Sequence, residues 1–154
     1  MKIRIELEED ISEDEIIIKC TSVDKKIQEI QQAISNIIKS DVKISFFKEN
    51  KEYYLQLNEI LFFETNENHV DAHTRDDVYT TKYRLYELEE ILPYNFSRVS
   101  KSTILNINNI LSISRNLASS NLVQFYKSHK QVYVSRYYFK DLHKKLSERR
   151  NYEK

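Results

Sequence analysis

The sequence predicts an α+β protein that is mainly β, with a small β-β-α unit over residues 1–41 followed by a multi-stranded antiparallel domain over residues 42–154. The first observation is a change of pattern near residue 41, where a helical repeat of isoleucines gives way to short β-branched and aromatic runs. The second is composition, because 154 residues that are 40% hydrophobic and 31% charged suffice for one globular domain and a small appendage. Glycine is absent and proline occurs once, so tight turns are expected to use Asn, Asp and Ser.

The N-terminal unit is predicted to run strand, strand, helix. Ile3, Ile5 and Leu7 alternate with polar residues, which is the period of a half-buried strand, and residues 15–20 form a second, β-branched run. A helix is expected to begin after a cap at Ser22 or Asp24. Its isoleucines recur at spacings of three and four, so they share one stripe: Ile27, Ile30, Ile34 and Ile37.

Two strands and one helix bury too little apolar surface to be stable alone. The hypothesis that follows is dimerisation, in which the isoleucine stripe packs against the same unit of a second chain. The alternative is that the stripe packs on the second domain of its own chain. A monomer mass that does not change with concentration in ultracentrifugation would rule out the dimer.

From residue 42 onward most segments have the length and composition of strands, and two helical patterns interrupt them. The first helix is expected to have Leu85, Leu88, Ile91 and Leu92 on its apolar face and to end at Pro93; the second, basic helix spans about Tyr137–Glu148. The expected strands are Lys43–Phe47, Glu52–Leu57, Leu61–Glu64, His69–Thr74, Val78–Tyr83, Ser102–Leu105, Leu111–Ser114, Leu122–Phe125 and Gln131–Val134.

Several function classes are disfavoured. Without glycine the chain has no glycine-rich phosphate loop and no glycine-flanked nucleophile turn, so neither an enzyme nor a nucleotide cofactor is expected. His69 and His73 share one strand face, but no third ligand has a recognisable spacing, so no metal site is expected. Cys20 is the only cysteine, and no stretch is long and apolar enough to span a bilayer; we expect a cytoplasmic protein without membrane insertion.

The charge is distributed unevenly although the net charge is zero. Residues 98–154 carry 12 Lys and Arg against 3 Asp and Glu, whereas the first 97 residues are acidic. Such asymmetry is typical of a polyanion-binding portion, with a merely solvated basic helix as the alternative. Three polar clusters could contact a duplex through phosphates and base edges, and they contain Asn68 and His69; Arg98, Ser100, Lys101 and Ser102; and Ser135, Arg136, Tyr137 and Lys140.

Four ordered blocks carry a resemblance to a known family. They are Leu57–Thr65 with His69 and Val70, Tyr83–Pro93, Phe96–Asn106, and Val132–Leu142. Together they make residues 42–147 similar to a LytTR-type DNA-binding domain. The resemblance implies an elongated β fold that inserts loops into successive major grooves, as in bacterial transcription regulators.

The resemblance also implies roles for individual residues. His69 matches a base-contacting position in the first loop, Lys101 matches the base contact of the second loop, and Arg98 and Ser102 match its phosphate-binding flanks. Arg136 belongs to the third contact region, where Tyr137 replaces the second of two consecutive cations common in the family, so either residue is a candidate base reader. Ser100 stands where many members have histidine.

Only about forty residues precede the matched region, too few for the phosphoacceptor domain of a response regulator. The chain therefore resembles the freestanding LytTR regulators, whose input is not phosphorylation of their own receiver domain. We expect a sequence-specific duplex-DNA-binding regulator that reads paired half-sites as a homodimer. The alternatives are a protein–protein interaction module and a binder of single-stranded nucleic acid.

Overall fold

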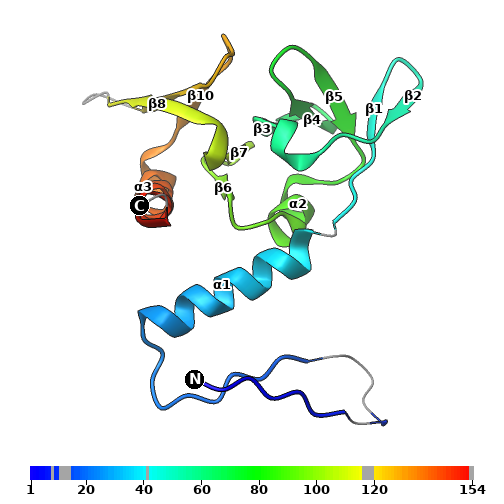
Figure 1. Cartoon of the computed structure of the whole chain (residues 1–154). Coiled ribbons are helices and arrows are strands. Elements are labelled where there is room, and N and C mark those ends of the chain that lie inside the picture. The colour runs from blue at the N-terminus through cyan, green and yellow to red at the C-terminus, as the bar shows by residue number, and fades with distance from the viewer. Residues whose placement is uncertain (8, 11–14, 41, 116–119, 153–154) are drawn as a thin grey trace.

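The structure is a computed structural model that describes residues 1–7, 9–10, 15–40, 42–115 and 120–152. In the described residues, two antiparallel sheets and three α-helices follow the order α1 (Lys25–Ser40), β1 (Phe46–Lys48), β2 (Lys51–Tyr53), β3 (Phe62–Asn66), β4 (His69–His73), β5 (Val78–Thr81), α2 (Leu85–Ile91), β6 (Phe96–Arg98), β7 (Thr103–Asn106), β8 (Ile110–Ser114), β9 (Asn121–Phe125), β10 (Gln131–Val134) and α3 (Arg136–Tyr152) (Figure 1). Short 3₁₀ turns at Leu57–Glu59 and Ile107–Asn109 precede β3 and β8. The predicted mixed, mainly antiparallel fold of residues 42–154 is confirmed.

The larger sheet has the strand order β2-β1-β5-β4-β3-β7-β6, with every neighbouring pair antiparallel. One of its faces buries a core of aromatic and aliphatic side chains, in which Phe46 stacks on Phe63 with ring centroids 6.4 Å apart. Helix α2 covers this core with Leu85 and Leu88. The chain leaves α2 at Leu92 and turns at Pro93, as the sequence predicts, because proline cannot continue a helix.

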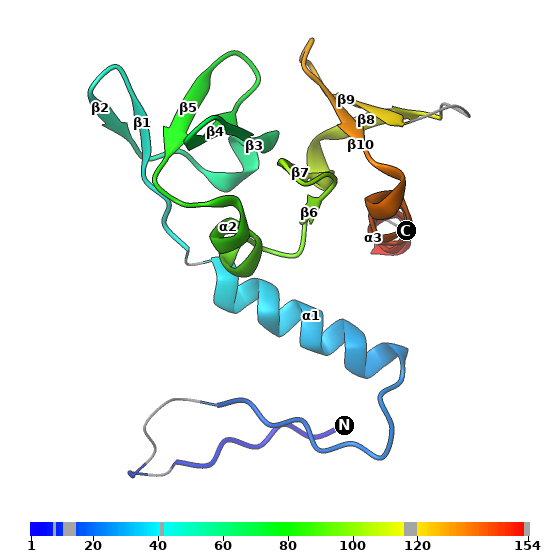
Figure 2. The same cartoon turned by 180° about the vertical axis from the view of Figure 1, so that it is seen from behind.

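The smaller sheet, β10-β9-β8, forms a second core with α3. Leu142 of α3 is completely buried there, together with Val123 and Val134. Phe62 of the larger sheet stacks on Phe125 of the smaller one, with ring centroids 5.6 Å apart. This contact joins the two sheets, which lie at an angle to each other in Figures 1 and 2.

The turns differ from the expectation that Asn, Asp and Ser would fill them. Four residues adopt a left-handed backbone conformation: Glu49, Asn50, Glu67 and Lys127. Only Asn50 is of the expected type. A residue with a Cβ atom loses about 1–2 kcal/mol in the left-handed conformation. The pairing of the flanking strands, β1 with β2, β3 with β4 and β9 with β10, therefore imposes this conformation on the hairpin turns.

The N-terminal unit requires a correction. Its helix is present as α1, but in the described parts of residues 1–24 neither predicted strand forms. The side chains of Ile3, Ile5 and Leu7 are 83–95% exposed. Alternating residues create one apolar face, yet a strand also needs a hydrogen-bonded neighbour, and these segments have none in the described chain. The sequence prediction also missed β6, which has only three residues.

No helix among the described residues is long and apolar enough to cross a membrane.

Candidate nucleic-acid interface

The first candidate region is the turn between β3 and β4. Asp71, which is only 9% exposed, organises it by accepting a hydrogen bond from the Asn66 side-chain amide at 2.9 Å and by lying 3.1 Å from Nε2 of His69. Arg84, at the start of α2, donates to the main-chain oxygen of Asn68 at 3.2 Å. The exposed His69 imidazole is therefore oriented by a buried carboxylate, and a cation stands beside the turn.

The second region is the loop between β6 and β7, and Arg98 holds it from within. The side chain of Arg98 is 19% exposed, and its Nε donates to the carbonyl oxygen of Ser100 at 2.8 Å. Its two terminal nitrogens bind the carbonyl oxygen of Lys101 and, at 2.8 Å, the carboxylate of Glu89. The guanidinium thus fixes the backbone on which the exposed Lys101 is carried.

Hydroxyl groups complete this loop. The hydroxyl of Ser100 accepts a hydrogen bond from the backbone N–H of Ser102 at 3.2 Å, and the two serine hydroxyls lie 3.3 Å apart. Ser102 is exposed, and Ser100 is half-buried. Both hydroxyls stand beside Lys101, so a phosphate placed at this loop would meet a cation and two donors.

The third region is the start of α3. Ser135 precedes the helix, and its carbonyl oxygen accepts from the backbone N–H groups of Tyr138 and Phe139, each at 3.1 Å. Arg136, Tyr137 and Lys140 are exposed on the first turn. A helix N-terminus with nearby cations suits an anion, because its first backbone N–H groups lack helical partners.

Two main-chain hydrogen bonds join the three regions. The N–H of Thr65, near the end of β3, donates to the carbonyl oxygen of Ser102 at 2.8 Å. The N–H of Ser135 donates to the carbonyl oxygen of Val99 at 2.9 Å. These bonds hold three segments that are far apart in the sequence next to one another. We call their exposed side the three-loop surface: residues 66–69, 98–102 and 135–140.

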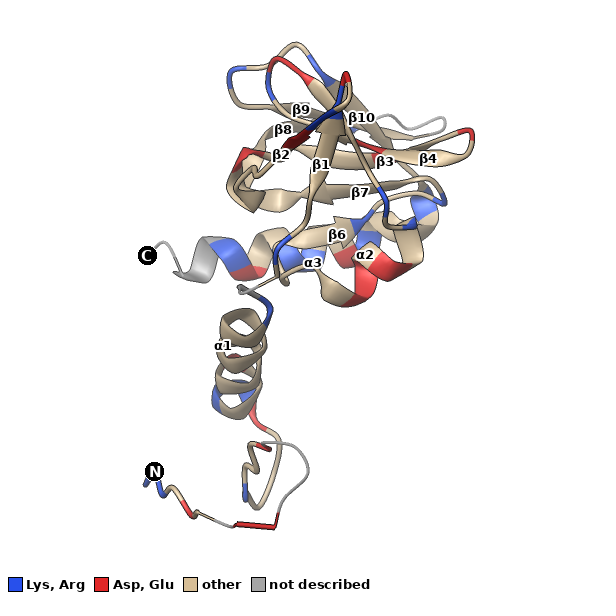
Figure 3. Cartoon of the chain, turned by 90° about the vertical axis from the view of Figure 1, so that its right-hand side faces the viewer, with Lys and Arg blue, Asp and Glu red and all other residues tan. Residues whose placement is uncertain are grey.

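Helix α2, beside this surface, carries acidic residues, which are the red parts of that helix in Figure 3. Glu89 is one of them and is neutralised by its ion pair with Arg98. The exposed cations of the three-loop surface are Lys101, Arg136 and Lys140, with Arg84 next to it. Arg84 was not among the contact residues predicted from the sequence. The feature that could have indicated it is a second cation, two residues after Lys82, at the N-cap of a short amphipathic helix.

His73 lies on the same strand as His69 but belongs to the interior. Its ring stacks on Phe62 with centroids 4.1 Å apart, and its Nε2 is buried without a hydrogen-bond partner. Burial, and next the positive charge of Lys130, lowers the pKa of His73 to about 4, while Asp71 acts in the opposite direction. No group of three or more His, Cys, Asp or Glu residues that could hold a metal ion occurs in the described ranges.

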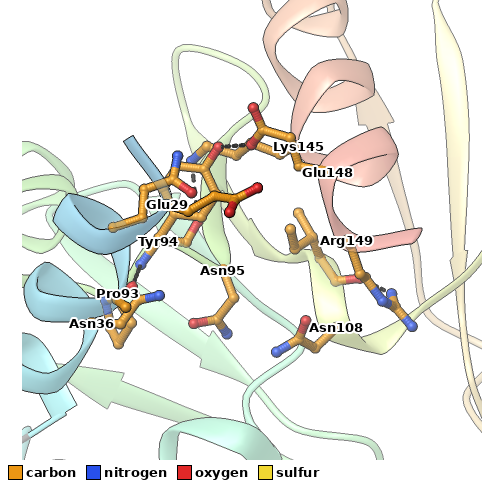
Figure 4. A pocket seen from close by; sticks show the side chains of 12 residues that line it. Glu29, Asn36, Pro93, Tyr94, Asn95, Asn108, Lys145, Glu148 and Arg149 are labelled. Carbon is orange, nitrogen blue, oxygen red and sulfur yellow. Dashed lines mark hydrogen bonds between the residues drawn. The ribbon is translucent and has the colours of Figure 1, made fainter. Parts of the chain in front are cut away.

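Helix α1 presents two different faces. Its polar side lines a hollow of about 610 Å³ between α1, the turn after α2 and the end of α3 (Figure 4). Asn36 of α1 accepts a hydrogen bond from the backbone N–H of Tyr94 at 3.1 Å across this junction. On the opposite wall Lys145 donates to the carbonyl oxygens of Tyr94 and Phe96 at 3.2 and 3.0 Å, and burial lowers the pKa of Lys145.

The comparisons with known proteins agree on one family. The LytTr DNA-binding domain family matches residues 50–147 of the chain. An uncharacterised HTH-type transcriptional regulator of Staphylococcus aureus strain bovine RF122 is 29% identical over 148 residues, which cover 96% of this chain and 99% of the relative. Its counterpart in strain COL is 28% identical with the same coverage.

A solved structure shows the same fold. It is the LytTr DNA-binding domain of a methyl-accepting/DNA response regulator from Bacillus cereus, with a TM-score of 0.62 and 24% sequence identity. The alignment covers 68% of this chain and 95% of that domain.

Proposed function

Because the chain belongs to the LytTR family of DNA-binding domains, we propose that it is a sequence-specific transcriptional regulator that binds duplex DNA in the cytoplasm through the three-loop surface. The observation that carries the proposal is the pair of main-chain hydrogen bonds that join the three loops, Thr65 to Ser102 and Ser135 to Val99. A surface assembled in this way can present several base-reading side chains at fixed relative positions, which sequence readout requires.

The proposal divides the surface into base readers and phosphate contacts. His69, Lys101 and either Arg136 or Tyr137 are exposed at the three loops and are assigned to base edges in the major groove. A second set supplies hydroxyl, amide or cationic groups and is assigned to the phosphate backbone: Asn68, Ser100, Ser102, Ser135 and Lys140.

Arg98 is assigned a different role from the one implied by the resemblance. Its guanidinium is engaged with Ser100, Lys101 and Glu89, so a phosphate contact would require it to give up bonds within the chain. We therefore propose that Arg98 is a positioning residue that shapes the loop under Lys101.

The regulator is proposed to act as a homodimer that reads paired half-sites, since two identical domains held by one interface meet two related sequences. The isoleucine stripe of α1, Ile27, Ile30, Ile34 and Ile37, supports this proposal because the polar face of α1 is the one that borders its own domain. The relatives that match nearly the whole chain are named as HTH-type transcriptional regulators, which supports the regulatory role.

Selection of bound fragments from random duplex DNA at two salt concentrations tests this function. We expect enrichment of two related half-sites and a steep loss of affinity with salt, because phosphate contacts release counterions. Lys101→Ala should weaken binding to the selected site by about 1–3 kcal/mol, whereas Lys51→Ala, an exposed cation on β2 outside the surface, should not. Absence of enrichment at low salt would contradict the proposal, and equal competition by single-stranded DNA would favour the single-strand alternative.

A further inference from the structure

The exposed aliphatic side chains gather at the N-terminal end of the described chain. Among the residues that the structure describes, nine large aliphatic side chains before residue 39 are strongly exposed, and only Val78 and Leu111 join them after it. The nine are Met1, Ile3, Ile5, Leu7, Ile16, Ile17, Val23, Ile37 and Ile38. Such a concentration of exposed apolar side chains in one part of the chain is typical of an interaction surface, because scattered single residues are the usual pattern.

The chain in this region is extended but unpaired. Residues 1–7 and 15–20 lie outside any strand ladder of the described structure, although their sequences alternate or branch as strands do. Figures 1 and 2 show both lengths of chain on the side of α1 that is turned away from the DNA-binding domain. In the part of the chain that the structure describes, they therefore join neither of the two sheets.

Helix geometry separates the apolar stripe from the chain's own domain. With 3.6 residues per turn, Ile27, Ile30 and Ile34 point in nearly the opposite direction from Glu29 and Asn36. Glu29 and Asn36 line the hollow against the DNA-binding domain. The domain therefore borders the polar face of α1, and helix geometry puts the isoleucines on the opposite side. Figures 1 and 2 show the backbone of residues 1–7 and 15–24 on the side of α1 away from the domain.

We propose that residues 1–7 of two copies of this chain pair with each other, antiparallel about a two-fold axis, at the centre of an intermolecular sheet covered by the two α1 helices. The inference rests on the proposed homodimer and specifies its interface. Two strands alone are only marginally stable in water, whereas a sheet of four strands with an apolar face can be stable. A second copy supplies the missing two, and the described residues before 40 are numerous enough to supply the roughly 20–30 residues a side of a standard interface.

Residues 1–7 are assigned to the centre because their apolar side chains are the most exposed ones. Ile3, Ile5 and Leu7 are 83–95% exposed, against 64% for Ile16 and Ile17. On the other face of the same segment, Arg4 and Glu6 form an ion pair at 3.0 Å that water can solvate. The segment thus has the apolar-in, polar-out alternation of a strand with one buried face.

Charge distinguishes this interface from the DNA contact. The first 41 residues carry 6 Lys and Arg against 10 Asp and Glu, so two copies repel each other and both repel anionic partners. Salt screens repulsion between exposed charges. Raising the salt concentration should therefore strengthen the dimer while it weakens DNA binding.

A cysteine scan of the full-length chain tests the pairing. In a Cys20→Ser background, single cysteines at positions 2–7 are oxidised and covalent dimers are measured. Antiparallel pairing about a two-fold axis brings only one position opposite itself, so the yield should peak at one residue and fall on both sides. Lys51→Cys, on the DNA-binding domain, is the control that should not cross-link. A flat yield, or cross-links confined to positions 15–20, would overturn the assignment.

Sedimentation separates this inference from the proposed function. The double variant Ile3→Ser/Ile5→Ser should shift the dimer toward monomer by at least tenfold in dissociation constant, while Arg4→Ser/Glu6→Ser on the opposite face should not. A dimer that survives the double substitution without cross-links would place the interface elsewhere and overturn this inference alone. A monomer at all concentrations that still binds duplex DNA would overturn the dimer and leave the DNA-binding function standing.

Discussion

Replacing Arg98 with alanine tests whether this residue holds the second DNA-contacting loop or contacts DNA itself. The substitution removes hydrogen bonds to the carbonyl oxygens of Ser100 and Lys101 and the ion pair with Glu89. Because the loop is exposed, water can rehydrate both carbonyls, so each lost hydrogen bond should cost about 1 kcal/mol. Glu89 is 52% exposed, so the ion pair adds at most about 1 kcal/mol. The free energy of unfolding should fall by about 2–3 kcal/mol.

DNA binding separates the two roles more sharply than stability does. If Arg98 positions Lys101, Arg98→Ala should lower affinity for the selected site by about 1–3 kcal/mol without changing the slope of log affinity against log salt concentration. A direct phosphate contact would instead reduce that slope by about one. Arg98→Lys keeps the charge but not the planar fork of donors, so it should restore little of either property.

Two measurements on the same three proteins suffice: urea unfolding, and titration of the selected duplex at several salt concentrations. The positioning role would be refuted by an Arg98→Lys variant with wild-type stability and affinity. It would equally be refuted by an Arg98→Ala variant that unfolds as the wild type does but has the shallower salt slope.

Three further predictions concern other parts of the fold. His73 has a lowered pKa, so the unfolded chain binds more protons between about pH 6.5 and 4, and stability is complete above that range and lost as pH falls through it. We expect urea unfolding to show a loss of about 1–2 kcal/mol between pH 7.5 and 5, which His73→Gln should abolish. Leu142→Ala should cost about 2–5 kcal/mol of unfolding free energy, because the side chain is completely buried between α3 and the smaller sheet; a loss below 1 kcal/mol would contradict that packing. His69→Ala should alter the selected sequence more than the total affinity, and a uniform loss across unrelated duplexes would count against base reading.

The helices and strands that could be predicted are those whose apolar pattern and end residues lie within one continuous segment. Helix α2 was predictable because its leucines share a face and a proline follows it. Strands β3, β4 and β9 were predictable because their apolar runs are long enough to show a pattern. Strand β6 has three residues and no such pattern, and its place at the sheet edge depends on pairing with β7.

The N-terminal segments show what an alternating pattern leaves open. Ile3, Ile5 and Leu7 define an apolar face, but the pattern says nothing about which backbone supplies the hydrogen bonds. In the single chain no strand among the described residues does so. The left-handed backbone conformation of Glu67 was likewise not predictable from its own segment. The pairing of β3 with β4 imposes a conformation that glutamate alone disfavours.

The candidate site could be proposed from the sequence as a set of residues but not as a set of roles. A cluster of basic and hydroxyl groups is typical of a polyanion-binding surface, and on this ground Lys101 and Arg136 were proposed as contacts. Whether a cation faces solvent or its own backbone depends on partners that the fold supplies. Glu89 lies nine positions before Arg98 and reaches it only because α2 packs beside β6. The orientation of His69 by Asp71 likewise follows from their shared strand face.

In the proposed homodimer, the two faces of α1 would keep dimerisation and DNA readout physically separate. The junction between α1 and the DNA-binding domain is bridged by the hydrogen bond from Tyr94 to Asn36, beside a hollow of about 610 Å³ that opens to solvent. A junction that is bridged by polar contacts and not filled by a core transmits little packing strain. Substitutions in residues 1–7 and in the loop that carries Lys101 share no contacts, so their free-energy effects should add. In that dimer, the distance between half-sites would be set by how α1 is held against its own domain, and not by the loops that are proposed to read the bases.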